Sequence, residues 1–208
     1  MRDAEGTRRR IERTALALFV EKGVAGTSIR DIAVGAGIAD GALYRHFPSK
    51  EALVWHLFAE NYLGFAATLE ELQRDAATAP DKIASMVRGF CAFFDEDWAL
   101  FAFLLIVQHG QLAKLPDGAA TPVDVVRRVV AEGMARGEIA AAGDPDLVTA
   151  MIAGTVLQAA TFKIYGRLTG TMSSYADDLA AACRRILGAA TAAASSFESR
   201  RERTGSEP

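Results

Sequence analysis

The chain has 208 residues, half of them hydrophobic and 24% charged, which is typical of a soluble globular protein. It has only six prolines and no strongly alternating stretch, so helices are favoured over sheet. The longest unbroken apolar run, Trp98 to Val107, is too short to cross a bilayer. The charged N-terminus lacks the apolar core of a signal peptide. These features argue against a membrane or secreted protein, and the expected location is the cytoplasm.

Charge is distributed unevenly along the chain. The formal net charge of −3 would by itself argue against binding to DNA. Residues 1–50, however, hold nine Lys and Arg against six Asp and Glu, a net charge of +3, which leaves −6 on the remainder. A basic N-terminal part on an acidic body is expected when one end of a protein faces phosphate groups.

Apolar spacing, capping residues and helix breakers predict nine helices. Gly23 and Gly137 are expected to end helices in the left-handed conformation, and Ser28 with Asp31 forms a capping-box pattern. Asp40 is a candidate cap, and Pro48 followed by Ser49 separates two helices. The predicted helices span Thr7–Lys22, Ser28 to about Gly35, Asp40–Phe47, Ser49 to beyond Leu69, Pro80 to beyond Phe94, Trp98–His109, Pro122–Arg136, Pro145–Tyr165 and Ser174–Ala193.

The predicted fold class is therefore all-α. Residues 1–50 are expected to form a three-helix DNA-binding domain of the helix-turn-helix type. Residues 51–195 are expected to form a helical bundle for ligand sensing and dimerisation. The polar residues 196–208 are expected to be a disordered tail.

The segment Thr27 to Leu53 carries the most specific signal. It reads as a short helix, a glycine turn and a second short helix. Ala33 is small enough for the second helix to cross closely above it, and Gly37 can take the positive φ of a tight turn. The spacing of apolar residues places a small core at Ile32, Ile38, Leu43 and Phe47.

This tract resembles the TetR family of transcriptional regulators. The matching residues are Ala15–Phe19, Lys22–Gly23, Ile32–Ala33, Ala36–Ile38 and Gly41–Leu53. The resemblance is specific over the first quarter of the chain, and beyond it concerns only the helix layout. It implies a transcriptional repressor that binds a palindromic operator as a homodimer and is released by a small molecule. Because no cluster of charged residues calls for a charged ligand, the expected ligand is hydrophobic or amphipathic.

The resemblance also implies particular contacts to DNA. Tyr44, His46 and Lys50 are expected on backbone phosphates, and Arg30 is expected to reach base edges. Thr27 and Ser28, at the start of the second helix, are expected to hold a phosphate through a hydroxyl and free N–H groups. Gly41 lets the third helix approach the DNA closely. The roles of three further residues stay open. Asp40 either accepts a hydrogen bond from a cytosine amino group or only caps its helix. Ala42 can touch a thymine methyl group, and Arg45 is a candidate donor to a base.

Alternatives to these contacts remain open: Tyr44 as a packing residue, and Arg45 and Lys50 as solvated charges. The run Arg8-Arg9-Arg10 either adds phosphate contacts or is a solvated helix face. An intracellular enzyme built on a helical bundle is the remote alternative, and the sequence lacks the clustered titratable groups that it would need. His46, His56 and His109 show no metal-ligand or triad spacing, so neither a metal nor a cofactor is expected. Cys91 and Cys183 are expected to be reduced, buried thiols, the alternative being a disulfide if the fold brings them together.

The C-terminal part suggests a dimer surface and a pocket. The family resemblance places the dimer on the last two predicted helices, with Leu157, Ala160, Leu179, Cys183, Ile186 and Leu187 as candidate interface residues. The alternative is ordinary intramolecular core. Aromatic and polar residues that fit a small-molecule pocket, or equally a packed core, are Phe90, Phe94, Trp98, Phe101, Gln108, His109, Gln158 and Phe162. Without such a ligand, the chain would be a ligand-independent or partner-controlled DNA-binding regulator.

Overall fold

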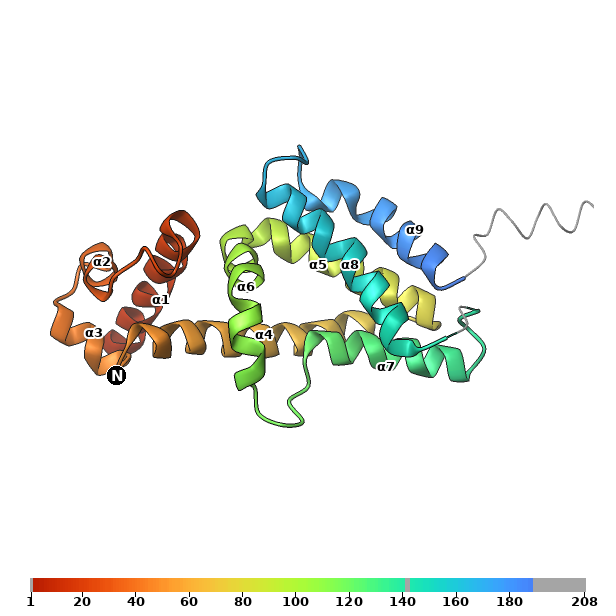
Figure 1. Cartoon of the computed structure of the whole chain (residues 1–208), viewed down its shortest axis with the longest axis horizontal. Coiled ribbons are helices and arrows are strands. Elements are labelled where there is room, and N and C mark those ends of the chain that lie inside the picture. The colour runs from red at the N-terminus through yellow and green to blue at the C-terminus, as the bar shows by residue number, and fades with distance from the viewer. Residues whose placement is uncertain (1, 141–142, 189–208) are drawn as a thin grey trace, which may run out of the picture. The chain divides into compact units, whose positions relative to one another are not determined.

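The computed structural model describes residues 2–140 and 143–188, and this part of the chain is entirely helical (Figure 1). Its α-helices are α1 (Arg2–Lys22), α2 (Ile29–Gly35), α3 (Asp40–His46), α4 (Lys50–Gln73), α5 (Ala79–Glu96), α6 (Trp98–Gln111), α7 (Pro122–Ala135), α8 (Pro145–Ile164) and α9 (Ala176–Ile186). Short 3-10 turns cover Leu112–Lys114 and Met172–Tyr175. The all-α prediction with nine helices is confirmed for the described residues, whereas the predicted tail at 196–208 lies outside them.

Helix ends follow the local chemistry that the sequence predicted. Ser28 accepts a hydrogen bond from the N–H of Asp31, and the Asp31 carboxylate accepts one from the N–H of Ser28 at 2.8 Å. Gly23 and Gly37 have φ values of 76° and 65°, which side chains rarely tolerate. One cap prediction is wrong. The N-cap of α3 is Ala39, which makes no side-chain bond, and Asp40 is already the first helical residue.

The chain folds as two compact units. The head unit comprises the residues up to Phe65 together with Glu96–Ala119, and the body unit comprises Ala66–Asp95 together with the residues from Ala120 onward. Helix α4 contributes to both units. These units differ from the predicted domains, whose boundary at residue 50 divides DNA binding from ligand sensing and dimerisation. That functional boundary stays a prediction.

The head unit has one hydrophobic core that includes α6. Phe19 of α1 stacks on Phe103 of α6 with ring centroids 5.7 Å apart. Leu104 and Val107 are buried in the same cluster as the residues of the first four helices. The remaining core members are Ile11, Ala15, Ile32, Ala33, Ala36, Leu43, Phe47, Leu53, Val54, Leu57 and Phe58. The sequence did not predict that α6 supports the three N-terminal helices, because only its position in space reveals this role.

The body unit buries one stripe of each of its helices. In α5 the apolar residues Ile83, Val87, Phe90 and Phe94 follow one another at helical intervals of three or four, and all are buried. Cys91 and Cys183 are both buried free thiols, and burial raises the pKa of each to about 11. At neutral pH both side chains are therefore protonated and behave as small apolar residues.

Candidate nucleic-acid interface

The head unit holds α2 and α3 at a fixed angle through a short glycine turn. Ile32 and Ala33 of α2 and Leu43 of α3 are completely buried. The N–H of Ile38 donates to the carbonyl of Ala33 at 3.0 Å, and Gly37 provides the positive φ that the reversal requires. Because the buried side chains and the turn fix this geometry, the outer face of α3 is presented as a rigid surface.

The outer face of α3 consists of residues that its own fold leaves exposed. Tyr44 is 53% exposed, and Asp40, Gly41 and Arg45 are also exposed. Ala42 and His46 are half-buried beside them. A Cβ added at Gly41 would meet no atom within 4 Å, so nothing inside the protein requires a glycine there. All six candidate DNA contacts predicted on α3 thus lie at or next to a single exposed face.

The structure corrects the predicted role of Thr27. This residue is 1% exposed, and its hydroxyl donates to the carbonyls of Leu18 and Gly23. Its N–H donates to the carbonyl of Val24. Both of its donors are therefore used inside the head unit, where they fix the connection between α1 and α2, and neither is free to hold a phosphate.

Ser28 is exposed but also committed to local structure. Its hydroxyl donates to the Asp31 carboxylate at 2.6 Å, and its N–H donates to the same carboxylate. These bonds hold the pKa of Asp31 below its ordinary value of 3.8. The Asp31 carboxylate therefore already occupies the N–H and hydroxyl donors of Ser28 that were predicted to hold a phosphate.

Lys50 serves the fold as well as carrying charge. Its ammonium group donates to the carbonyls of Val24 and Thr27 at 2.8 and 2.9 Å, while the side chain stays half-exposed. An ammonium group has three donors, so one N–H remains for a phosphate. The two internal bonds hold this charge in place at the start of α4.

The N-terminal arginines behave differently from one another. The guanidinium of Arg8 lies 4.7 Å from the ring centroid of Phe47 and donates to Glu12 at 3.1 Å. Arg9 pairs with Glu5 in an exposed (i, i+4) ion pair, and Arg10 is exposed. Arg8 is thus engaged within the head unit, which leaves Arg10 and the exposed Arg30 on α2 as the more accessible cations.

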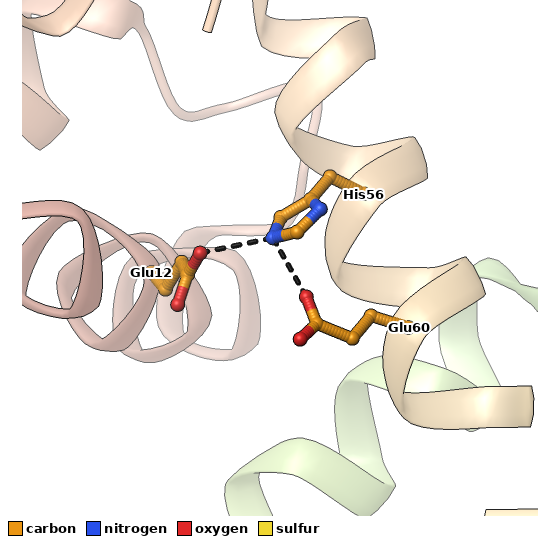
Figure 2. A group of neighbouring side chains, drawn as sticks. All are labelled: Glu12, His56 and Glu60. Atoms are coloured by element: carbon orange, nitrogen blue, oxygen red, sulfur yellow. Dashed lines mark hydrogen bonds and ion pairs between the residues drawn. The ribbon is translucent and has the colours of Figure 1, made fainter. Parts of the chain in front are cut away.

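One cluster in the head unit was missed by the sequence analysis. The carboxylates of Glu12 and Glu60 both lie 2.9 Å from Nε2 of His56 (Figure 2). His56 and Glu60 are four residues apart on α4, a spacing that places them on one helix face. Glu12 comes from α1, 44 positions earlier in the chain, and no pattern in the sequence links it to that pair.

The body unit exposes an apolar stripe on α8. Leu147, Met151 and Phe162 of α8 are 60, 42 and 42% exposed, and Tyr165, the C-cap residue directly after the helix, is 70% exposed. Gly154 and Gln158 are exposed as well, and the six positions follow one another at intervals of three or four residues, so they share one helix face. Among the described helices, α8 is the single one long and apolar enough to cross a membrane, judged by length and composition alone.

The predicted dimer residues divide into two groups. Leu157, Leu179 and Ile186 are partly exposed, whereas Ala160, Cys183 and Leu187 are completely buried within the chain. The buried three are packed behind the surface, so they can support an interface but their side chains do not reach it. In this respect the alternative reading as intramolecular core applies to them.

The predicted pocket residues are distributed over both units. Phe90 and Phe94 are buried in the body unit with ring centroids 6.3 Å apart. Phe101 is buried in the head unit, with its ring edge-on to Phe65 at 5.2 Å. The other candidates are more accessible: Gln108 is half-buried, and Trp98, His109, Gln158 and Phe162 are exposed.

Known proteins resemble this chain in both sequence and fold. The sequence model of the family described as bacterial regulatory proteins, tetR family, matches residues 11–57. The transcriptional repressor KstR2 of Mycobacterium tuberculosis is 33% identical over 154 residues, which cover 68% of this chain and 73% of KstR2. The fatty acid metabolism regulator protein of Bacillus subtilis is 27% identical over 177 residues, covering 83% of this chain and 88% of that protein.

Two solved structures show the same fold. The structure of the ketosteroid transcriptional regulator KstR2 of Mycobacterium tuberculosis has a TM-score of 0.70 at 25% identity, covering 87% of this chain and 93% of that one. The transcriptional regulator FadR of Bacillus subtilis, solved in complex with stearoyl-CoA, has a TM-score of 0.69 at 21% identity, covering 88% of this chain and 99% of that one. The likeness extends well beyond the helix-turn-helix segment into the body unit.

Proposed function

We propose that this chain, which belongs to the TetR family of bacterial regulatory proteins, is a transcriptional repressor. It binds a palindromic operator as a homodimer and leaves the operator when a small amphipathic ligand binds. Membership makes the chain a DNA-binding transcriptional regulator and not an enzyme, since its relatives are named as regulators and repressors. Such regulators act inside the cell, and we place this one in the cytoplasm. The observation that supports DNA binding most directly is the exposed face of α3.

The candidate contact residues divide by chemistry into two kinds of contact. Tyr44, Lys50 and His46 offer donors without base-specific geometry, which suits phosphate oxygens. Arg45 and Arg30 carry guanidinium groups, which can donate two parallel bonds to a guanine edge in the major groove. Asp40 does not cap α3, so of its two predicted roles the one we propose is that its carboxylate accepts a hydrogen bond from a cytosine amino group.

Dimerisation is supported by the apolar stripe on α8. Four large apolar side chains on one helix face are costly to leave in water, and a second copy can cover them through a two-fold interface. A Cβ added at Gly154 would meet no atom within 4 Å, so the glycine leaves room for close approach of another helix. Leu179 and Ile186 of α9, which are partly exposed, extend the apolar surface that we assign to this interface.

A ligand class follows from the relatives rather than from a cavity. The structurally similar FadR was solved with stearoyl-CoA, and a relative with 27% identity is named for fatty acid metabolism. An acyl-coenzyme A thioester is amphipathic, which agrees with the hydrophobic or amphipathic ligand expected from the sequence. We therefore propose an acyl-CoA thioester as the class of ligand that releases this protein from DNA.

Fluorescence anisotropy with duplexes from the DNA flanking its own gene tests this function. We expect two chains per palindromic duplex, much weaker binding to a half-site, and release by stearoyl-CoA but not by coenzyme A alone. If operator binding persists at every thioester concentration, the chain is a ligand-independent or partner-controlled regulator. If the purified chain is monomeric, or leaves duplex DNA unbound in low-salt buffer, the proposal fails altogether.

A further inference from the structure

Three side chains in the head unit converge on one point between two helices. Nε2 of His56 lies 2.9 Å from Oε1 of Glu12 and 2.9 Å from Oε2 of Glu60. Figure 2 shows this nitrogen directed toward both carboxylates, one from α1 and one from α4. Glu12 and His56 are half-buried, and Glu60 is exposed. The cluster serves neither the α3 face nor the α8 stripe.

The hydrogen-bonding capacity of the imidazole is smaller than this arrangement demands. Nε2 carries at most one hydrogen, yet two carboxylate oxygens lie at equal distances from it. A cation placed among the three groups would satisfy both carboxylates at once. One ligand atom from each residue lies within 4.8 Å of the other two, which is close enough for a single ion.

The donor set indicates which ion this would be. Imidazole nitrogen suits Zn²⁺, Ni²⁺ and related first-row ions, and carboxylate oxygen completes such sites at metal–ligand distances of about 2.0–2.2 Å. Two ligands at that distance and at right angles are about 3 Å apart, close to the separations between Nε2 and the two carboxylates. Two ligands on one helix with i, i+4 spacing and a third from a neighbouring helix can therefore hold such an ion.

Arg8 is the group that competes with a metal ion. Its guanidinium donates to Glu12 at 3.1 Å, and its terminal nitrogen lies 3.3 and 3.1 Å from Nδ1 and Nε2 of His56. If Nε2 bound a metal, Nδ1 would carry the hydrogen and would face an arginine donor. Binding of an ion thus requires Arg8 to turn away, which its 39% exposed side chain permits.

We propose that Glu12, His56 and Glu60 form a binding site for a divalent first-row transition ion, Zn²⁺ or Ni²⁺, that links α1 to α4 within the head unit. The ion takes the place of the Arg8 guanidinium as the cation between the carboxylates. Because it binds the folded head and not the separated helices, it stabilises the folded chain. This proposal does not depend on DNA, operator sequence or an organic ligand.

Titration of the full, untagged chain with ZnCl₂ and NiCl₂ tests the site by calorimetry and by thermal unfolding. We expect one ion per chain and a rise in Tm that EDTA reverses. Glu60→Gln removes one ligand from an exposed position and should weaken binding by at least about tenfold, while His56→Gln should abolish it. Glu71→Gln is the matched control, since Glu71 is an equally exposed, ion-paired residue of the same helix, and it should leave binding unchanged.

The Arg8→Ala variant separates a metal site from a network of charged hydrogen bonds. Removal of the competing cation should tighten Zn²⁺ binding if the three residues are ligands. Circular dichroism confirms that each variant is folded. The proposal is overturned if the wild-type chain binds no ion, if Glu60→Gln and Glu71→Gln bind equally well, or if Arg8→Ala does not bind more tightly.

Discussion

The exposed faces of α3 in the head unit and of α8 in the body unit have opposite chemistry. On α3 the exposed residues are a glycine, an aspartate, a tyrosine and an arginine. On α8 the exposed face carries Leu147, Met151, Phe162 and Tyr165 and no charged residue. The first face is polar and suits a charged partner, whereas the second gains most when water is excluded from it.

The difference between the two faces lies in residues whose type packing does not dictate. Buried residues in both units are explained by packing, and they would be apolar whatever the protein did. The exposed residues of α3 and α8 do not have to be apolar in order to pack. We assign DNA to the first face and a second copy of the chain to the second, and the following variants act on one assignment at a time.

The largest effect is expected from charges placed on the α8 face. The double variant Met151→Asp/Phe162→Asp would bury two unpaired carboxylates in the proposed interface, a cost that few interfaces tolerate. We expect dimerisation to weaken by at least about a hundredfold, and operator binding to fall with it because two heads no longer bind together. Sedimentation equilibrium measures the first effect and anisotropy the second.

Val123→Asp is the matched control for that variant. Val123 is also an exposed apolar residue of the body unit, at 46% exposed, but lies on α7. It should leave the dimer intact. Equal loss of dimer in both variants would indicate general damage to the body unit, and an unchanged dimer in the α8 variant would refute the assignment of this face.

An intermediate effect is expected from Lys50→Ala in the head unit. Loss of one phosphate contact should weaken binding about tenfold on operator and random DNA alike, and should reduce the slope of log K against log salt by about 1. Because the variant also loses the two bonds to the carbonyls of Val24 and Thr27, its Tm should fall, and the slope is the readout that isolates the phosphate contact. Lys114→Ala removes the same charge from an exposed lysine elsewhere in the head and should leave the slope unchanged. A loss confined to one operator position would contradict a phosphate role.

Gly41→Ala is expected to have two smaller effects of opposite sign, a gain in stability and a loss of affinity for the operator. An alanine has open space at this position and favours helix over glycine by about 0.5–1 kcal/mol, so the free energy of unfolding should rise. The added methyl group lies on the DNA-facing side, and affinity for the operator should fall severalfold. Gly110→Ala on α6, which also has open space, should stabilise the head without loss of DNA binding. If Gly41→Ala keeps full affinity, close approach at this residue is not needed.

The helices and all caps but that of α3 were predictable because their causes are local. The Ser28 capping box, the Gly37 turn and the exposed residues of α3 all depend on neighbours within a few positions. Thr27 was misassigned because the carbonyls that occupy its hydroxyl belong to Leu18 and Gly23, and only the fold places them there. The packing of α6 in the head and the approach of Glu12 to His56 depend likewise on contacts between residues far apart in the chain, which periodicity does not reveal.

The smallest predicted effect concerns the carboxylate at the start of α2. Asp31→Asn removes the charge that accepts both bonds from Ser28, so the variant should be slightly less stable than wild type at neutral pH. Because folding lowers the pKa of Asp31 from 3.8, its contribution is present above that pH and is lost as the pH falls through the lower folded value. Thermal unfolding from pH 7 to pH 2 should therefore show the two Tm curves converging at the acidic end.

In a Ser28→Ala background the same substitution should change Tm less, since the hydroxyl partner is already gone. A difference between the curves that stays constant with pH would mean that the charge of Asp31 plays no part in the cap.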